Sequence, residues 1–140
     1  MEPTKPVPSK DSFTEVMEKT LELTGQKVPP KSVRNLYQIF TSLMWEFPDY
    51  NVSLYTILNE EGQFKYAKML KGEPDAHIIL KAEQLHQVVY GRGNMPKMFL
   101  TGQIKLIGVP KLKLMKFVPL LGPFLDSYKE AYESMISEVP

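Results

Sequence analysis

The sequence of 140 residues contains no cysteine. This absence excludes a disulfide framework, a thiolate zinc site and a cysteine nucleophile, and it suits a reducing compartment. The first residues, MEPTKPVPSK, hold no apolar stretch of the kind found in signal peptides. No window reaches the roughly 18 uninterrupted apolar residues that a membrane span requires. We therefore expect a soluble, intracellular protein of the cytoplasm.

Sequence signatures of enzymes are also missing. There is no H-E-x-x-H, G-x-S-x-G or Walker sequence, and the close pair Gly91 and Gly93 lacks the third glycine of a dinucleotide loop. His77 and His86 have no carboxylate at metal-ligand spacing, so we expect both to be exposed or hydrogen bonded at the surface. The carboxylates of predicted turns favour local hydrogen bonds over acid-base catalysis; they are Asp49, Glu60, Glu61, Glu73 and Asp75. We expect no enzyme activity, no resident cofactor and no metal.

Arginine is scarce, and acidic residues are missing from one long stretch. Arginine occurs only at positions 34 and 92, so the sequence does not favour nucleic-acid binding. The formal net charge is +1, yet no acidic residue lies between Glu83 and Asp126. The positive residues of this stretch are Arg92, Lys97, Lys105, Lys111, Lys113 and Lys116. They are either solvated faces of helices and strands or a basic surface for anionic lipid head groups or a phosphate-bearing ligand.

The composition, with 43% hydrophobic and 24% charged residues, suffices for one hydrophobic core. We expect a disordered leader over residues 1–10, because it is rich in Pro, Lys and Ser, and a single domain over residues 11–140. Capping-box spacing at Ser12 predicts the start of a first amphipathic helix, and Gly25 predicts its end. A short second helix is predicted from about Lys31.

Alternation of apolar and polar residues then predicts five strands. In the last of them, Ile104 and Leu106 share one face, and Lys105 and Ile107 share the other. Several strands are apolar on both faces, so we expect helices or a ligand to cover both sides of the sheet. The predicted strands span residues 42–47, 52–58, 64–69, 76–80 and 103–107.

Helical spacing returns in the second half of the sequence. A helix is predicted from Glu83, and Pro96 begins a further helical turn that is rich in Met and Phe. After the last strand, Gly122 and Pro123 are expected to separate two amphipathic helices, the second over residues 123–136. These segments supply more apolar surface than one face of the sheet needs. The surplus is either plain core packing or the wall of a ligand cavity, for which adaptable methionine side chains are suited.

Residues 74–121, PDAHIILKAEQLHQVVYGRGNMPKMFLTGQIKLIGVPKLKLMKFVPLL, resemble the sterol-carrier-protein-2-like lipid-binding domains. The pattern of that family is an acidic turn and short strand, a helix that ends in glycine, and a proline-led turn with an aromatic residue. The pattern continues with a glycine and a strand in which lysine alternates with apolar residues. It ends with a closing glycine and a leucine-rich helix. The residues in the matching places are Asp75, Gly91, Pro96, Phe99, Gly102, Lys105 and Gly108.

The resemblance implies an α+β fold in which about five helices cover a five-stranded, mostly antiparallel sheet and leave an apolar tunnel. Such tunnels take acyl chains, acyl-CoA, sterols or similar lipids without catalysis. The residues expected to line or close the tunnel are Met98, Phe99, Ile104, Leu106, Leu112, Met115, Val118 and Leu121. The residues expected to meet an anionic head group or a membrane surface are Lys97, Lys111, Lys113 and Lys116.

The leading hypothesis is therefore a non-enzymatic carrier of an apolar lipid. The rival is an interaction module, in which the same fold is fully packed and docks on a partner protein or serves a lipid- or isoprenoid-metabolising enzyme. A small hydrolase or transferase would require an activated nucleophile, which the sequence does not reveal. The last helix has three open roles: it covers the tunnel mouth, extends the core or forms a homodimer contact.

Overall fold

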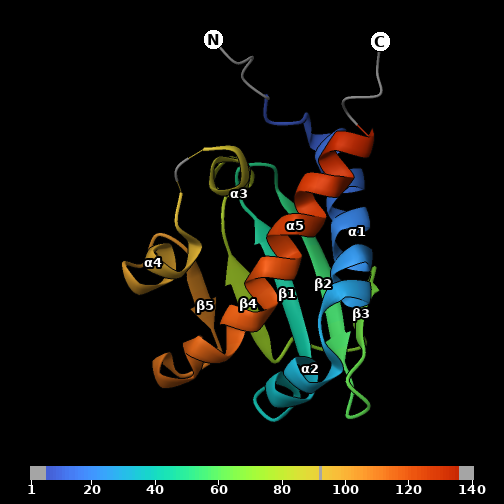
Figure 1. Ribbon diagram of the computed structural model, residues 1–140, viewed down its shortest axis with the longest axis vertical. Coiled ribbons are helices and arrows are strands. Elements are labelled where there is room, and N and C mark those ends of the chain that lie inside the picture. Colours follow the sequence, from blue (N-terminus) through green and yellow to red (C-terminus); the bar gives the residue numbers. More distant parts are fainter. Residues whose placement is uncertain (1–5, 92, 136–140) are drawn as a thin grey trace.

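The computed structural model describes residues 6–91 and 93–135, apart from the side chains of residues 111, 112 and 114. Within these residues it has one sheet of five strands in the order β3-β2-β1-β4-β5 (Figure 1). The β1–β4 pair is parallel and the other three pairs are antiparallel, which confirms the mostly antiparallel sheet. The strands are β1 (Ser42–Phe47), β2 (Val52–Leu58), β3 (Phe64–Ala67), β4 (Ala76–Ile79) and β5 (Lys105–Ile107).

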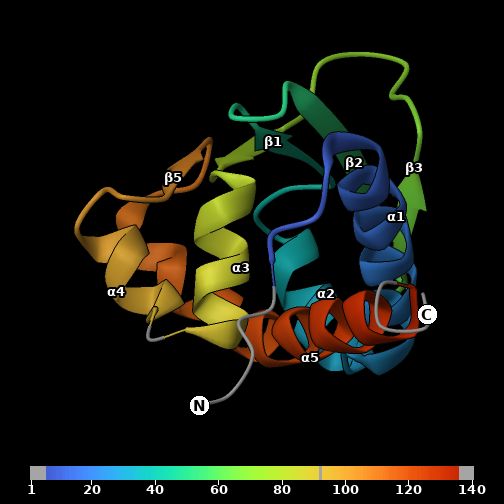
Figure 2. The ribbon, with the colours of Figure 1, turned by 90° about the horizontal axis from the view of Figure 1, so that it is seen from above.

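The described helices confirm the predicted α+β class. They are α1 (Lys10–Lys27), α2 (Pro30–Tyr37), α3 (Ala82–Tyr90), α4 (Met95–Leu100), the 3₁₀ helix η1 (Lys111–Phe117) and α5 (Val118–Met135). They lie on the same side of the sheet in the view from above (Figure 2). No helix among the described residues is long and apolar enough to cross a lipid bilayer.

The two faces of the sheet differ in burial. On the helix side, Trp45 pairs with Leu54 and Ile78, and all three side chains are buried. On the opposite side, Ser53 and Ile57 are exposed. The prediction that both sides are covered is therefore wrong for the residues that the structure describes. An antiparallel sheet tolerates water on one face, and here serine and lysine separate the apolar residues of that face.

Helices α1 and α5 close the core over the sheet. Phe13 of α1 meets Phe47 edge to face, with ring centroids 4.8 Å apart. Phe124 of α5 stacks on Trp45 at 4.7 Å. Of the three roles left open for the last helix, α5 thus fills the second, because its apolar face extends the core.

The start and the end of α1 differ from the prediction. Its N-cap is Ser9, whose Oγ accepts a hydrogen bond from the backbone N–H of Ser12 at 3.5 Å, so Ser12 lies inside the helix. The predicted end at Gly25 is wrong as well. A Cβ atom at this position would lie 2.3 Å from the carbonyl oxygen of Phe64, so the glycine allows α1 to approach β3 closely.

Two residues of the N-terminal segment accept hydrogen bonds from the domain. Tyr132 donates a hydrogen bond to the carbonyl oxygen of Pro6 at 2.8 Å, and Tyr50 donates one to that of Pro8. Pro6 and Pro8 therefore contact the domain, and the disordered leader over residues 1–10 stays a prediction. Residues 1–5 of that predicted leader lie outside the described residues.

The predicted break at Gly122 and Pro123 is wrong, because both residues lie inside α5. The pyrrolidine nitrogen of Pro123 cannot donate the usual helical hydrogen bond. The neighbouring side chains Leu120, Leu121 and Phe124 are buried, and this burial offsets the loss. The predicted range of residues 123–136 thus falls within the longer α5, apart from residue 136, which lies outside the described residues.

Candidate functional site

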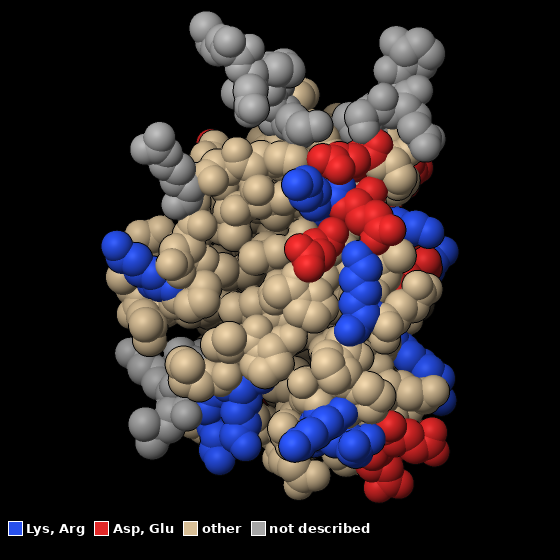
Figure 3. Space-filling model, in the orientation of Figure 1, with Lys and Arg blue, Asp and Glu red and all other residues tan. Residues whose placement is uncertain are grey.

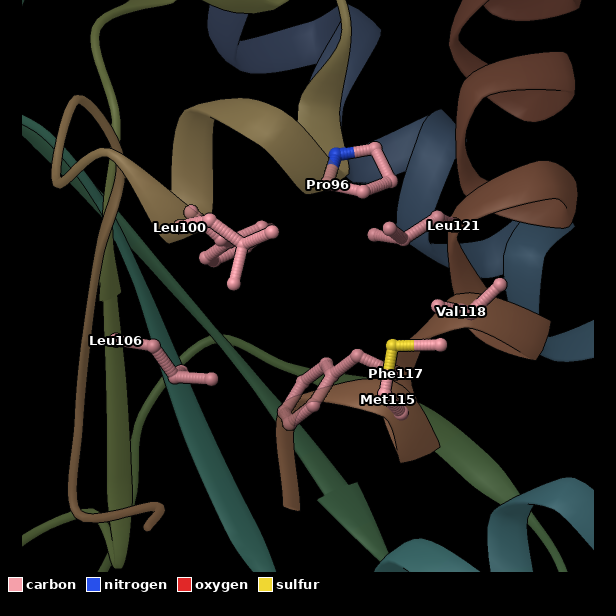
Figure 4. Close-up of a pocket in the computed structure, with 8 residues that line it drawn as sticks. Pro96, Leu100, Leu106, Met115, Phe117, Val118 and Leu121 are labelled. Atoms are coloured by element: carbon pink, nitrogen blue, oxygen red, sulfur yellow. The ribbon is translucent and has the colours of Figure 1, made fainter. Parts of the chain in front are cut away.

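An apolar cavity lies between α4, β5, η1 and the first turn of α5 (Figure 4). The volume of this cavity is about 40 Å³. In the close-up, the labelled side chains from these four elements point toward one another around the cavity. The lining residues are Pro96, Phe99, Leu100, Leu106, Met115, Phe117, Val118 and Leu121. All eight are apolar, so their side chains favour an apolar occupant and supply no acid, base or nucleophile.

Local hydrogen bonds position α4, which forms one wall of the cavity. Asn94 caps α4, because its Oδ1 accepts a hydrogen bond from the backbone N–H of Lys97 at 3.0 Å. Pro96 stands in the first turn, where its missing N–H has no helical partner to lose. The backbone N–H of Ile104 donates to the carbonyl oxygen of Met98 at 3.1 Å, which holds the chain between α4 and β5.

The far end of β5 is fixed by a glycine. Gly108 has a φ of +88°, and a Cβ atom there would lie 2.4 Å from the carbonyl oxygen of Asp75. Only glycine combines this left-handed conformation with so close an approach to the start of β4. The predicted closing glycine of the last strand thus has a direct structural reason.

The structure brings together five of the eight predicted tunnel residues, and these five line the cavity: Phe99, Leu106, Met115, Val118 and Leu121. Ile104 is buried and borders a second, more open hollow, which shares Phe99, Leu100 and Leu106 with the cavity. Met98 is half-buried and packs against the core. The side chain of Leu112 lies outside the described residues.

Sequence reasoning missed three lining residues, Pro96, Leu100 and Phe117. Pro96 and Leu100 are four residues apart in α4, so helical spacing alone puts them on one face and could have identified both. Phe117 follows Met115 by two residues. Its role depends on the 3₁₀ geometry of η1, which the sequence pattern did not predict.

The mouth of the cavity consists of exposed apolar side chains. Leu100 is 75% exposed, Met115 is 74% exposed and Val118 is 42% exposed. The cavity itself is much smaller than the roughly 300–1,000 Å³ of typical small-molecule sites. The described residues therefore enclose a small pocket with an apolar rim, and the extended tunnel stays a prediction.

Exposed lysines stand on two of the elements that form this mouth. Lys97 of α4 and Lys113 and Lys116 of η1 are exposed, whereas the side chain of Lys111 lies outside the described residues. On the face drawn in Figure 3, the blue side chains reach the edges of α4 and η1, and the red carboxylates lie away from both elements. Neither α4 nor η1 contains an acidic residue. The electrostatic surroundings of the mouth therefore favour an anion.

The histidines take no part in the cavity. His86 is buried, contrary to the expected surface position, and its Nδ1 lies 3.0 Å from the hydroxyl group of Tyr128. Burial raises the pKa of Tyr128 well above its usual value. His77 lies on the open face of the sheet, with its Nε2 atom 3.6 Å from Oε1 of Glu46. Within the described part of the chain, no group of three His, Asp or Glu side chains could hold a metal ion.

No family model and no curated protein matches the sequence. Solved structures do match the fold. A crystal structure of sterol carrier protein 2 aligns with a TM-score of 0.56 and 16% identity, over 84% of this chain and 97% of that chain. UbiJ-SCP2, a ubiquinone synthesis protein, aligns with a TM-score of 0.51 and 18% identity, over 89% of this chain and 99% of that chain.

A third structure is much longer than this chain. The stereoselective inverting sec-alkylsulfatase Pisa1 from Pseudomonas sp. aligns with a TM-score of 0.52 and 19% identity, over 79% of this chain. This chain spans only 16% of the length of that enzyme. The other two structures match along nearly their whole length. The chain therefore has the fold of sterol carrier protein 2.

Proposed function

We propose that this domain binds the apolar chain of a lipid, without catalysis, in the cavity between α4, β5, η1 and α5. The observation that carries the proposal is the convergence of eight apolar side chains below an exposed apolar mouth. Each buried CH₂ group contributes about 0.8 kcal/mol, so affinity increases with chain length. A fatty acyl chain, an acyl-CoA or a sterol-like lipid fits this chemistry.

Binding of a whole chain requires the cavity to widen, because its present volume is about 40 Å³. The walls that can move are short: α4 has six residues and η1 has seven. Leu100 and Met115 stand on these two elements and are mostly exposed, so their displacement breaks few core contacts. The unbranched side chain of Met115 can also adapt to ligands of irregular shape.

Support also comes from the structural neighbours. One is named sterol carrier protein 2, and the other combines that name with ubiquinone synthesis. The exposed lysines of α4 and η1, which are Lys97, Lys113 and Lys116, suit a ligand with an anionic head group. The lining residues bring no reactive group to a bound chain, which favours carriage over chemistry.

A second candidate function is a packed interaction module that docks on a partner protein. The small volume of the cavity favours it, since a fully packed domain needs no internal ligand. The two candidates differ in one property: only a carrier binds a lipid more tightly as its chain becomes longer.

The test is a titration of fluorescent fatty acids of increasing chain length into the protein at moderate salt. We expect Met115→Asp to weaken binding by about tenfold or more, because it places a charge at the apolar mouth. Lys113→Ala should weaken binding much less. Met69→Asp is the matched control, because Met69 is 80% exposed and follows β3, at the opposite edge of the sheet from β5. Equal losses in the two aspartate variants, or none, would contradict the cavity assignment.

A further inference from the structure

Six large apolar side chains are exposed among the described residues. Three of them, Leu100, Met115 and Val118, line the cavity. Their side chains project from two elements, α4 and η1, and from the first residue of α5. We call this surface the α4–η1 rim and define it by these three residues together with Lys97, Lys113 and Lys116.

The 3₁₀ geometry of η1 sorts its residues into rows. With three residues per turn, side chains three positions apart point in the same direction. Lys113 and Lys116 therefore form one exposed row, and Met115 forms a second row with Val118, the residue that follows η1. Phe117 belongs to the third row and is buried. A basic row thus lies directly beside an apolar row, and both are exposed.

The charge of the rim has one sign. Neither α4 nor η1 contains a carboxylate, and none occurs in the sequence from residue 84 to residue 125. A second copy docked rim to rim would place lysine against lysine, which is unfavourable. Nucleic acid would match the lysines but would leave Leu100 and Met115 without an apolar partner. An anionic lipid surface offers phosphate to the lysines and hydrocarbon to the apolar row.

The amphipathic helix α1 is not available for the same role. Four of its five large apolar residues, Phe13, Val16, Met17 and Leu21, are fully buried, and the fifth, Leu23, is half-buried against the core. Contact with a membrane through α1 would require the domain to open. The α4–η1 rim presents its apolar side chains without any such change.

We propose that the α4–η1 rim docks the domain on membranes that contain anionic lipids. Lys97, Lys113 and Lys116 contact the head groups, while Leu100 and Met115 enter the boundary between head groups and acyl chains. Docking in this orientation places the cavity mouth against the bilayer. The inference concerns the surface around the proposed cavity and does not require the cavity to hold a ligand.

The test is co-sedimentation of the full chain with two kinds of vesicle: pure phosphatidylcholine, and equal parts of phosphatidylcholine and phosphatidylglycerol. We expect binding to the anionic vesicles that weakens as salt is raised, because salt screens exposed charges. Replacing Lys113 and Lys116 by alanine should weaken binding by about fivefold for each lysine. The matched control is the pair Lys68→Ala and Lys71→Ala, two exposed lysines between β3 and β4, which should change nothing.

The apolar part of the rim is tested by the double variant Leu100→Ser and Met115→Ser. We expect vesicle binding to fall by about tenfold or more. Met69→Ser is the control, because it removes an equally exposed methionine outside the rim. Circular dichroism checks that each variant is folded. Equal binding to both kinds of vesicle, or equal effects of rim and control variants, would overturn the proposal.

Fatty-acid binding and vesicle binding of the wild-type protein together distinguish this inference from the proposed function. Fatty-acid binding in solution without vesicle binding overturns the docking surface and leaves the carrier function intact. Vesicle binding by a protein that takes up no fatty acid supports the docking surface and removes the carrier. Loss of a dimer in the Leu100 and Met115 variant, with no vesicle binding by the wild type, would assign the rim to self-association instead and overturn the proposal.

Discussion

The ring of Phe124 stacks on the indole of Trp45 with a centroid distance of 4.7 Å and an interplanar angle of 20°. This contact joins α5 to the central strand of the sheet and closes the core next to Leu121, which lines the cavity. Both rings are buried. The packing at the base of the site thus depends on an aromatic pair between residues far apart in the sequence.

We expect Phe124→Ala to lower the free energy of unfolding by about 3–5 kcal/mol, because it removes a buried ring and leaves a cavity. Urea unfolding followed by the fluorescence of Trp45, the single tryptophan of the chain, measures the loss. Phe124→Leu is the control and should cost clearly less. A loss below about 1 kcal/mol for the alanine variant would show that α5 does not depend on this contact.

A carboxylate links the starts of the two parallel strands. Asp75, before β4, accepts hydrogen bonds from the backbone N–H of Thr41 at 2.9 Å and from its hydroxyl group at 2.6 Å. These hydrogen bonds lower the pKa of Asp75 below its usual value. The stabilisation is therefore fully present above pH of about 4 and is lost as the pH falls through the folded-state pKa.

Asp75→Asn should accordingly destabilise the protein at neutral pH, and the difference from the wild type should shrink as the medium becomes strongly acidic. Urea unfolding at a series of pH values measures this difference. Glu73→Gln removes the same charge from an exposed side chain two residues earlier and serves as the control. A difference for Asp75→Asn that does not change with pH would contradict the role of the ionised carboxylate.

Gly108 should not tolerate a side chain. Its φ of +88° and the 2.4 Å approach of a Cβ atom to the Asp75 carbonyl oxygen both oppose alanine. We expect Gly108→Ala to lower the free energy of unfolding by roughly 1–3 kcal/mol and to loosen β5. Gly72→Ala is the control, because a Cβ atom at Gly72 would meet no atom within 4 Å. Similar effects of the two substitutions would refute the close approach.

Alkaline pH should weaken the packing of α1 against β3. Burial and the nearby carboxylate of Glu18 raise the pKa of Tyr66 to about 12. A raised pKa means that the stabilisation is complete below the unfolded-state pKa of about 10 and is lost as the pH rises toward the folded-state value. We expect Tyr66→Phe to lose less stability than the wild type between these limits. Equal losses of stability at alkaline pH in Tyr66→Phe and the wild type would contradict the role of Tyr66. Tyr55→Phe is the control for the removal of a tyrosine hydroxyl group.

Much of the sheet could be predicted because its signal is local. Alternation over residues 42–47 and 52–58 gave the observed bounds of β1 and β2, since one face of each strand is buried and the other is not. The faces of β5 also agree with the prediction: Leu106 pairs with Ile78 on the helix side, and Lys105 and Ile107 lie on the other. The resemblance implied a five-stranded, mostly antiparallel sheet covered by helices, and the structure confirms this fold.

Features that depend on distant contacts could not be predicted in this way. Gly25 matches the pattern of a helix end, and only the contact with Phe64 explains why the helix continues past it. Gly122 and Pro123 match the pattern of a break, and only the burial around them explains why they lie inside α5. His86 meets Tyr128, 42 positions later in the chain. The volume of the cavity is also a tertiary property, because it depends on how closely α4 and η1 approach each other.

The most direct test of the account is native mass spectrometry of freshly purified protein, followed by solvent extraction of whatever is bound. We predict adducts whose masses correspond to lipids with apolar chains, and we predict that Met115→Asp reduces them while Met69→Asp does not. A single ligand-free mass that stays unchanged after incubation with fatty acids and phospholipids would contradict the carrier function and favour the packed interaction module.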